Sequence, residues 1–284
     1  MKTNEMIKAG LIGIGLVLIT GGSASAQYYY KDILSNKVAG DERLVLKDQK
    51  IRKIKVHSFE GNGEVSPGFF CEKEIGKDYR KMETYTRSNI SGKSLMTSYY
   101  NDKDQLVRAS DSSDLSVSTS TFEYNDKGNI ARIVSRSHSN DDDFNTQLIE
   151  AHEYYFDDNN RPVKMLRTRN GKDSAWIQFK LDDQGNVVDE IDESKNGKHY
   201  YYYYNDKKRL TDIVKFNTLR NKLVPDFVFE YNSIGQVTQM VAVEEGVSND
   251  YYTWKYTYND GLRIIEKCFS KEKILLGYFE YEYD

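Results

Sequence analysis

The sequence is poor in several residue types that carry chemistry. Its 284 residues include 3 prolines, 2 cysteines and 4 histidines. The histidines are scattered without the spacing of metal ligands: His57, His138, His152 and His199. No Ser/His/Asp or Cys/His signature and no glycine-rich phosphate loop occurs. We therefore expect no metal, no cofactor and no enzymatic activity. His152 falls in a core-facing column, which predicts a buried, hydrogen-bonded histidine.

Long hydrophobic runs are also missing. The longest, Ala9 to Ile19, has 11 residues, whereas a membrane-spanning helix needs about 20. Lys2 and Lys8 precede it and Ala24-Ser25-Ala26 follow, the layout of a secretory signal peptide cleaved after Ala26. A retained membrane anchor is the alternative. No cysteine follows the run, so a bacterial lipoprotein anchor is not supported. Residues 1–26 are therefore a predicted signal peptide, and the mature protein is expected to be periplasmic or extracellular.

The expected mature chain lacks a basic stripe. Without Lys2, Lys8 and Glu5, the 40 basic and 44 acidic residues become 38 and 43, a net charge of −5. Phosphate binding requires clustered Lys and Arg, so nucleic acid is not an expected partner. A hydrophobic fraction of 38% with 30% charged residues indicates a folded, soluble protein rather than a disordered one.

Tyrosine is abundant, at 23 residues, and it recurs in a repeated pattern. Each unit has an alternating aromatic segment, a short turn rich in Asn, Asp and Gly, and an aliphatic segment. The last residue before the turn is, in successive units, Tyr100, Tyr124, Phe156, Leu181, Tyr204, Tyr231 and Tyr258. The chain ends on Tyr283-Asp284, which matches the start of another unit. Such repetition is typical of repeat architectures.

Each unit reads as strand, turn, strand. Period-2 alternation places the aromatic columns on one face of a sheet. Apolar pairs three residues apart after the turn, such as Ile130 and Ile133, indicate a β-bulge. About eight hairpins predict an all-β fold: one long antiparallel meander sheet of about sixteen strands. Because its aromatic face would otherwise leave a large apolar patch exposed, the sheet must curl, fold over on itself or accept a partner.

The units divide the chain into three regions. Residues 1–26 are the signal peptide, 27–45 an N-terminal segment, and 46–284 the repeat domain, in which 46–90 hold degenerate units. A short helix within residues 30–50 is also possible. The tract from Ser137 to Phe144, with Asp141-Asp142-Asp143, is predicted to be a surface loop rather than a calcium site.

The stretch Tyr124 to Ile133, Tyr-Asn-Asp-Lys-Gly-Asn-Ile-Ala-Arg-Ile, resembles the RHS/YD-repeat family. The resemblance covers roughly residues 90–284 and, more weakly, 45–90. In large family members the repeats form a hollow β-sheet shell around a toxic cargo. This chain has only about eight units, no downstream cargo domain and no Asp-Pro self-cleavage motif, so shell building and toxin delivery are not carried over. The resemblance loosely implies carbohydrate binding.

Four tyrosines should project from the face opposite the aromatic columns: Tyr99, Tyr155, Tyr201 and Tyr203. Exposed rings with a polar tip suit stacking on a glycan or a cell-envelope protein. Cover by loops or by the N-terminal segment is the alternative. Cys71 and Cys268 could form a disulfide if the ends of the sheet meet, since export permits one; otherwise they are unpaired, apolar side chains.

We therefore expect an exported, non-catalytic β-repeat scaffold or binding protein, without membrane insertion after signal removal. An outer-membrane β-barrel is one alternative, since alternating strands with an apolar face could meet lipid. A secreted hydrolase that uses carboxylates of the chain is the other alternative.

Overall fold

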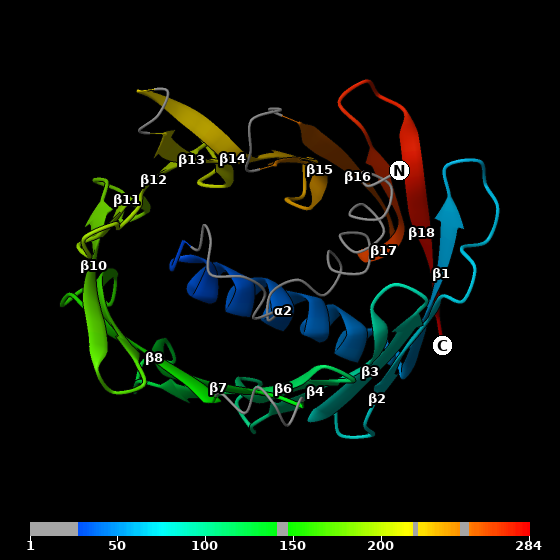
Figure 1. Ribbon diagram of the computed structural model, residues 1–284, viewed down its shortest axis with the longest axis horizontal. Coiled ribbons are helices and arrows are strands. Elements are labelled where there is room, and N and C mark those ends of the chain that lie inside the picture. The colour runs from blue at the N-terminus through cyan, green and yellow to red at the C-terminus, as the bar shows by residue number, and fades with distance from the viewer. Residues whose placement is uncertain (1–27, 141–146, 218–220, 245–249) are drawn as a thin grey trace.

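A closed wall of strands surrounds one helix in the computed structural model, which describes residues 28–140, 147–217, 221–244 and 250–284 (Figure 1). The expected signal peptide and Asp141–Asp143 lie outside these ranges. The helix is α2, Lys31–Asp48. The 18 strands are β1 Lys53–Glu60, β2 Phe70–Ile75, β3 Lys81–Ser88, β4 Gly92–Tyr100, β5 Leu106–Ser113, β6 Ser116–Tyr124, β7 Ile130–Ser139, β8 Gln147–Phe156, β9 Pro162–Arg169, β10 Asp173–Leu181, β11 Val187–Asp192, β12 His199–Tyr204, β13 Leu210–Asn217, β14 Lys222–Tyr231, β15 Val237–Val243, β16 Tyr251–Asn259, β17 Leu262–Phe269 and β18 Leu275–Tyr283.

The sheet is a barrel, which corrects the expected meander that curls or folds over. Every strand pairs antiparallel with the next, and the last strand, β18, pairs with β1 from Ile54↔Tyr283 to Glu60↔Gly277. Closure removes the unpaired edges that a meander would leave. The strand that supplies it, β1, lies in the degenerate N-terminal part of the chain. The all-β prediction is confirmed, with helix α2 inside the possible helical stretch.

The Asn/Asp-rich turns owe their sequence to side-chain hydrogen bonds. In the turn between β6 and β7, Asn125 Oδ1 accepts from the backbone N–H groups of Lys127 and Asn129 at 3.1 and 3.0 Å. Gly128 takes a φ of +85°, which glycine adopts without steric cost. The same acceptor position is occupied in five other turns by Asn101, Asp157, Asp182, Asn205 and Asn232. These turns all lie at one mouth of the barrel because the strands alternate in direction.

The predicted bulge follows each of these turns. Tyr124 pairs with Ile130 but Glu123 pairs with Arg132, so Ala131 is the extra residue. Equivalent shifts occur at Tyr100, Phe156, Leu181, Tyr204, Tyr231 and Tyr258. A bulge interrupts the ladder locally and leaves a backbone group in need of a partner.

A tyrosine of the next hairpin provides that partner. The Tyr124 hydroxyl on β6 donates to the Leu106 carbonyl on the neighbouring strand β5 at 2.8 Å. Four more units repeat this bond, from the hydroxyls of Tyr204, Tyr231, Tyr258 and Tyr283 to the carbonyls of Val187, Leu210, Val237 and Arg263. We call it the inter-hairpin tyrosine bond. It explains why the position before the turn is usually Tyr rather than Phe.

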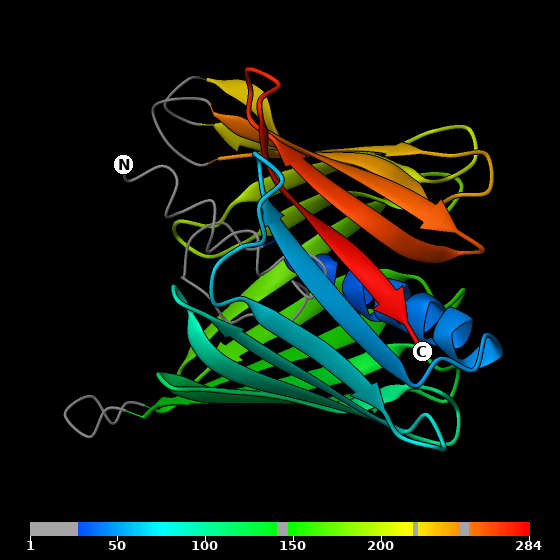
Figure 2. The same cartoon turned by 90° about the vertical axis from the view of Figure 1, so that its right-hand side faces the viewer.

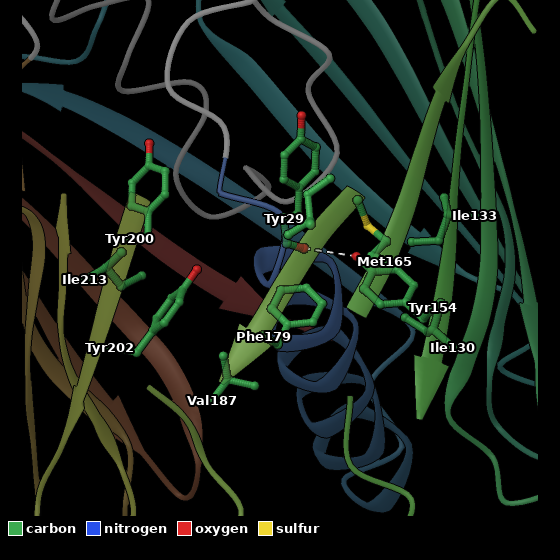
Figure 3. Packing of buried hydrophobic residues seen from close by; sticks show 11 residues of the cluster. Tyr29, Ile130, Ile133, Tyr154, Met165, Phe179, Val187, Tyr200, Tyr202 and Ile213 are labelled. Carbon is green, nitrogen blue, oxygen red and sulfur yellow. Dashed lines mark hydrogen bonds between the residues drawn. The ribbon is translucent and has the colours of Figure 1, made fainter. Parts of the chain in front are cut away.

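The aromatic columns face the inside of the barrel, as predicted. The largest cluster of buried residues includes Met165, Ile177 and Ile213, all fully buried, with Tyr200 and Tyr202 (Figure 3). Tyrosines 28 to 30 and Ile33 pack against the same cluster. The interior is therefore filled from two sources: the wall and the chain's own N-terminal segment, residues 28–48.

Barrel closure does not join the cysteines, so the possible disulfide is wrong. Cys71 on β2 and Cys268 on β17 are both free. Strands β18 and β1 separate them, and three strand spacings amount to about 14 Å. Disulfides need a Cα separation below about 7 Å. The two thiols instead act as separate apolar side chains, and burial raises the pKa of the Cys268 thiol to about 12.

The inter-hairpin tyrosine bond predicts a stability difference between two Tyr→Phe variants. Tyr231→Phe removes the hydroxyl that contacts the Leu210 carbonyl at 2.6 Å. We expect it to lower the free energy of unfolding by about 1–2 kcal/mol, because a partly buried carbonyl loses its donor. Tyr203→Phe, on the outer wall, is the matched control and should change it by less than about 0.5 kcal/mol. Urea unfolding followed by circular dichroism measures both; equal values would contradict the assignment.

Candidate functional site

The main polar site lies in the lumen, where side chains of the wall contact the N-terminal segment. Glu190 on β11 is 1% exposed. Its carboxylate accepts hydrogen bonds from the backbone N–H groups of Tyr29 and Tyr30 at 2.7 and 2.8 Å, and from the Tyr202 hydroxyl at 2.7 Å. Burial raises the pKa of Glu190 to about 7, against the opposing effect of these three donors.

A second luminal group centres on His152 of β8, which is buried and hydrogen-bonded as predicted. Its Nδ1 lies 2.6 Å from Asp32 of helix α2, and its Nε2 lies 2.9 Å from Glu150. Glu150 also pairs with Arg169. Burial, the largest influence, lowers the pKa of His152, but Asp32 and Glu150 together outweigh it and raise the pKa to about 9. Burial raises the pKa of Glu150, and His152 with Arg169 brings it down to about 2.

Tyr154 extends this group to the backbone of the N-terminal segment. Its hydroxyl lies 3.0 Å from the Tyr29 carbonyl, the bond drawn in Figure 3, and 2.8 Å from Asp32. The Tyr29 hydroxyl in turn accepts from Arg167 at 3.0 Å. The groups that resemble catalytic machinery are thus occupied by the chain itself.

The far end of helix α2 is fixed near the turn-bearing mouth. Arg43 is 1% exposed. It donates from Nε to the Tyr79 carbonyl at 2.9 Å and from Nη1 to Asp104 at 2.7 Å, and its guanidinium lies over the Tyr100 ring. On another part of the wall, Arg263 of β17 pairs with Glu42 at 3.2 Å. The helix therefore contacts two separate arcs of the wall.

The outer wall carries the aromatic residues singled out in the sequence. Tyr155 and Trp176 lie with ring centroids 5.5 Å apart, and Lys164 Nζ lies over both rings, at 5.3 and 4.7 Å. On β12, Tyr201 stacks on His199 at 4.2 Å. Tyr203 is 47% exposed and Tyr155 38%. The N-terminal segment covers none of these rings, because it lies inside the barrel.

Three of the four predicted tyrosines share one side of the barrel and the fourth does not. Tyr155, Tyr201 and Tyr203 lie on β8 and β12. Strand β10, with Trp176, lies between these two strands, whereas Tyr99 is on β4, beside Arg108, four strands from β8 and eight from β12. We define the outer aromatic surface as Tyr155, Lys164, Trp176, His199, Tyr201 and Tyr203.

Several residues of the luminal site and of the outer aromatic surface were not predicted from the sequence. Trp176 alternates with the core-facing Ile177, and this signal could have placed it outside. Glu190 and Arg43 gave no such signal. A buried carboxylate or guanidinium is unexpected in a polar chain, and the burial of these two depends on contacts with residues more than 35 positions away in the sequence.

In the described ranges, no group of three His, Cys, Asp or Glu side chains could hold a metal ion. No described helix has the length and apolar character needed to cross a membrane.

No family model matches the chain, and no curated protein matches it. Among solved structures it is similar to a porin-like protein from Bacteroides uniformis, at 10% identity and a TM-score of 0.38, covering 82% of this chain and 96% of that one. A porin-like protein from Bacteroides vulgatus gives 10% identity, a TM-score of 0.30 and coverage of 82% and 98%. The Photorhabdus luminescens Tc holotoxin pore gives 10%, 0.30, and coverage of 76% and 16%. The RHS/YD resemblance stays a prediction.

The luminal histidine predicts how stability depends on pH. Since the pKa of His152 is about 9 when folded and 6.5 ordinarily, its contribution is complete below pH 6.5 and lost as pH rises through 9. We expect the free energy of unfolding to fall by about 2–3 kcal/mol between pH 7 and 9.5.

His152→Gln should flatten this fall, whereas His138→Gln, on an exposed part of β7, should leave it in place. Urea titrations at a series of pH values measure the slope. An unchanged slope in His152→Gln would show that other groups cause it.

Proposed function

We propose that this chain is an exported, non-catalytic β-barrel that binds a cell-envelope glycan through the outer aromatic surface. The observation that carries the proposal is the group formed by Tyr155, Trp176 and Lys164, in which two tilted rings share one ammonium group. Exposed rings offer flat apolar faces to sugar rings, and the charged and hydroxyl groups at their edges can bond to sugar hydroxyls. His199, Tyr201 and Tyr203 extend the surface across β12.

The proposed absence of catalysis rests on the luminal groups. His152, Glu150 and Glu190 resemble an acid–base set, and their pKa values are displaced from the ordinary range. However, these side chains are hydrogen-bonded or ion-paired to other wall residues or to the N-terminal segment. A substrate would have to displace that segment before it could meet them.

An outer-membrane barrel is the second candidate function. The closed wall favours it, as do exposed apolar side chains on the outside of β12 to β14: Tyr203, Phe216 and Leu223. The outside of β1, β2 and β18 favours water. There Lys55 pairs with Glu282 at 3.0 Å and Lys53 with Glu72 at 2.8 Å. A lysine facing the bilayer midplane costs about 2–4 kcal/mol, so we place the barrel in the periplasm or outside the cell.

The glycan proposal predicts a loss of binding in defined variants. On an array of bacterial envelope glycans, we expect the mature protein to retain selected glycans. The double variant Tyr201→Ala, Tyr203→Ala and the single variant Trp176→Ala should each weaken binding about tenfold or more, as loss of an aromatic anchor does. Tyr99→Ala, on the distant strand β4, is the matched control and should bind normally.

Two outcomes would replace the proposal. If the array is blank and a pull-down with the same variants shows a tyrosine-dependent protein partner, the outer aromatic surface binds protein. If the full-length protein stays in carbonate-washed membranes of the expressing cell, the barrel is membrane-integral and the second candidate function is correct.

A further inference from the structure

The N-terminal segment is bound by the wall without being part of it. Barrel closure needs only β1 and β18, which pair over seven residues. Among the described residues, no backbone-to-backbone hydrogen bond joins residues 28–48 to a strand. Instead, side chains of the wall bind the segment, as a receptor binds a peptide. Figures 1 and 2 show helix α2 inside the ring of strands.

The strongest of these contacts is made to backbone N–H groups of the segment. Glu190 accepts from two consecutive N–H groups, those of Tyr29 and Tyr30, directly before helix α2. These are unpaired donors at the positive end of the helix, where a carboxylate is electrostatically favoured. A charged acceptor buried in the wall and aimed at backbone donors recognises the conformation of the segment rather than one side chain.

Aromatic side chains of the wall form pockets around the same residues. The Tyr28 ring lies 5.8 Å from Tyr200 and 6.1 Å from Phe227, measured between centroids. The Tyr30 ring lies 5.3 Å from Tyr202 and 6.0 Å from Phe179. These edge-to-face and tilted contacts select flat rings at both positions. Arg43 adds a second anchor at the other end of the helix.

We propose that the lumen is a peptide-binding site whose ligand class is a short aromatic segment leading into a helix, and that residues 28–48 occupy it as an exchangeable ligand in cis. The site is separate from the outer aromatic surface, so its test is independent of the proposed function. The connection to the wall is short and accessible, since Gln49 and Lys50 are exposed and lie between helix α2 and β1.

The experiment cuts that connection in the full chain. A recognition sequence for a site-specific protease is inserted after Lys50, and the purified protein is cleaved without denaturant. The freed fragment should co-elute with the barrel in native size exclusion. A fluorescein-labelled synthetic peptide of residues 27–50 should then exchange into the barrel, detected by fluorescence anisotropy. The same insertion in the wall turn at residues 170–172 is the control for cleavage and should allow no exchange.

Variants on both sides of the contact test the recognition. Glu190→Gln should weaken peptide binding about tenfold or more, because two backbone donors lose a charged acceptor. Glu193→Gln, nearby and exposed, is the matched control. In the peptide, Tyr29→Ala should bind more weakly and Val38→Ala, whose side chain is 47% exposed, should bind normally. The peptide variants leave the folding of the barrel untouched.

Three results would overturn the proposal. They are a labelled peptide that never exchanges, a cleaved protein that loses its near-ultraviolet circular dichroism, and equal binding of the wild-type and Tyr29→Ala peptides. The first two would mean that the segment is an inseparable part of the core. The third would mean that it is retained without recognition of its aromatic residues.

Discussion

The inter-hairpin tyrosine bond is the interaction on which the regularity of the barrel depends. A bulge after each Asn/Asp-rich turn disturbs the ladder, and the hydroxyl of a tyrosine in the next hairpin compensates it, as from Tyr124 to Leu106 beside the bulge between β4 and β5. Each such bond joins two consecutive hairpins through residues that are not neighbours in the sequence. It therefore sets the same offset between neighbours at every repeat where it occurs. A constant offset is what allows a long sheet to return to its first strand and close.

A barrel of this size needs an interior filling. Barrels of 16 to 18 strands are wide enough to leave a channel, and an unfilled lumen lined by aromatic rings would expose a large apolar area. Here the wall supplies the aromatic columns and the N-terminal segment supplies the rest, held by Glu190 at one end and Arg43 at the other. Buried charges of this kind are stable only with their partners in place. The wall and the segment are therefore complementary in charge as well as shape.

Local features of the fold could be predicted from the sequence. Alternation identified the inward aromatic columns, the turn residues located the hairpins, and the spacing of Ile130 and Ile133 indicated the bulge, because each depends on neighbouring residues alone. Closure could not be predicted in this way. It depends on the pairing of β1 with β18, more than 200 residues apart, and β1 carries no clear repeat signal. The choice between a disulfide and two unpaired cysteines could not be made from the sequence for the same reason, since strand order fixes the distance between Cys71 and Cys268.

For the candidate site, the outward direction of Tyr155, Tyr201 and Tyr203 followed from period 2, but their neighbours did not. Lys164 and Trp176 join Tyr155 only through the register of β8, β9 and β10. The contacts of the luminal groups were still harder to predict. His152 was correctly placed inside, yet its partner Asp32 comes from a helix 120 residues earlier in the chain.

Closure of the wall also limits how this protein can change in length during evolution. An open solenoid gains or loses a unit at its end and leaves the remaining units as they were. In a ring, a duplicated hairpin must widen the circumference everywhere. Arg263 and Asp104, the wall residues that pair with Glu42 and Arg43 of helix α2, would then move apart from these partners. The diameter of the ring and the packing of helix α2 inside it must therefore have been selected together.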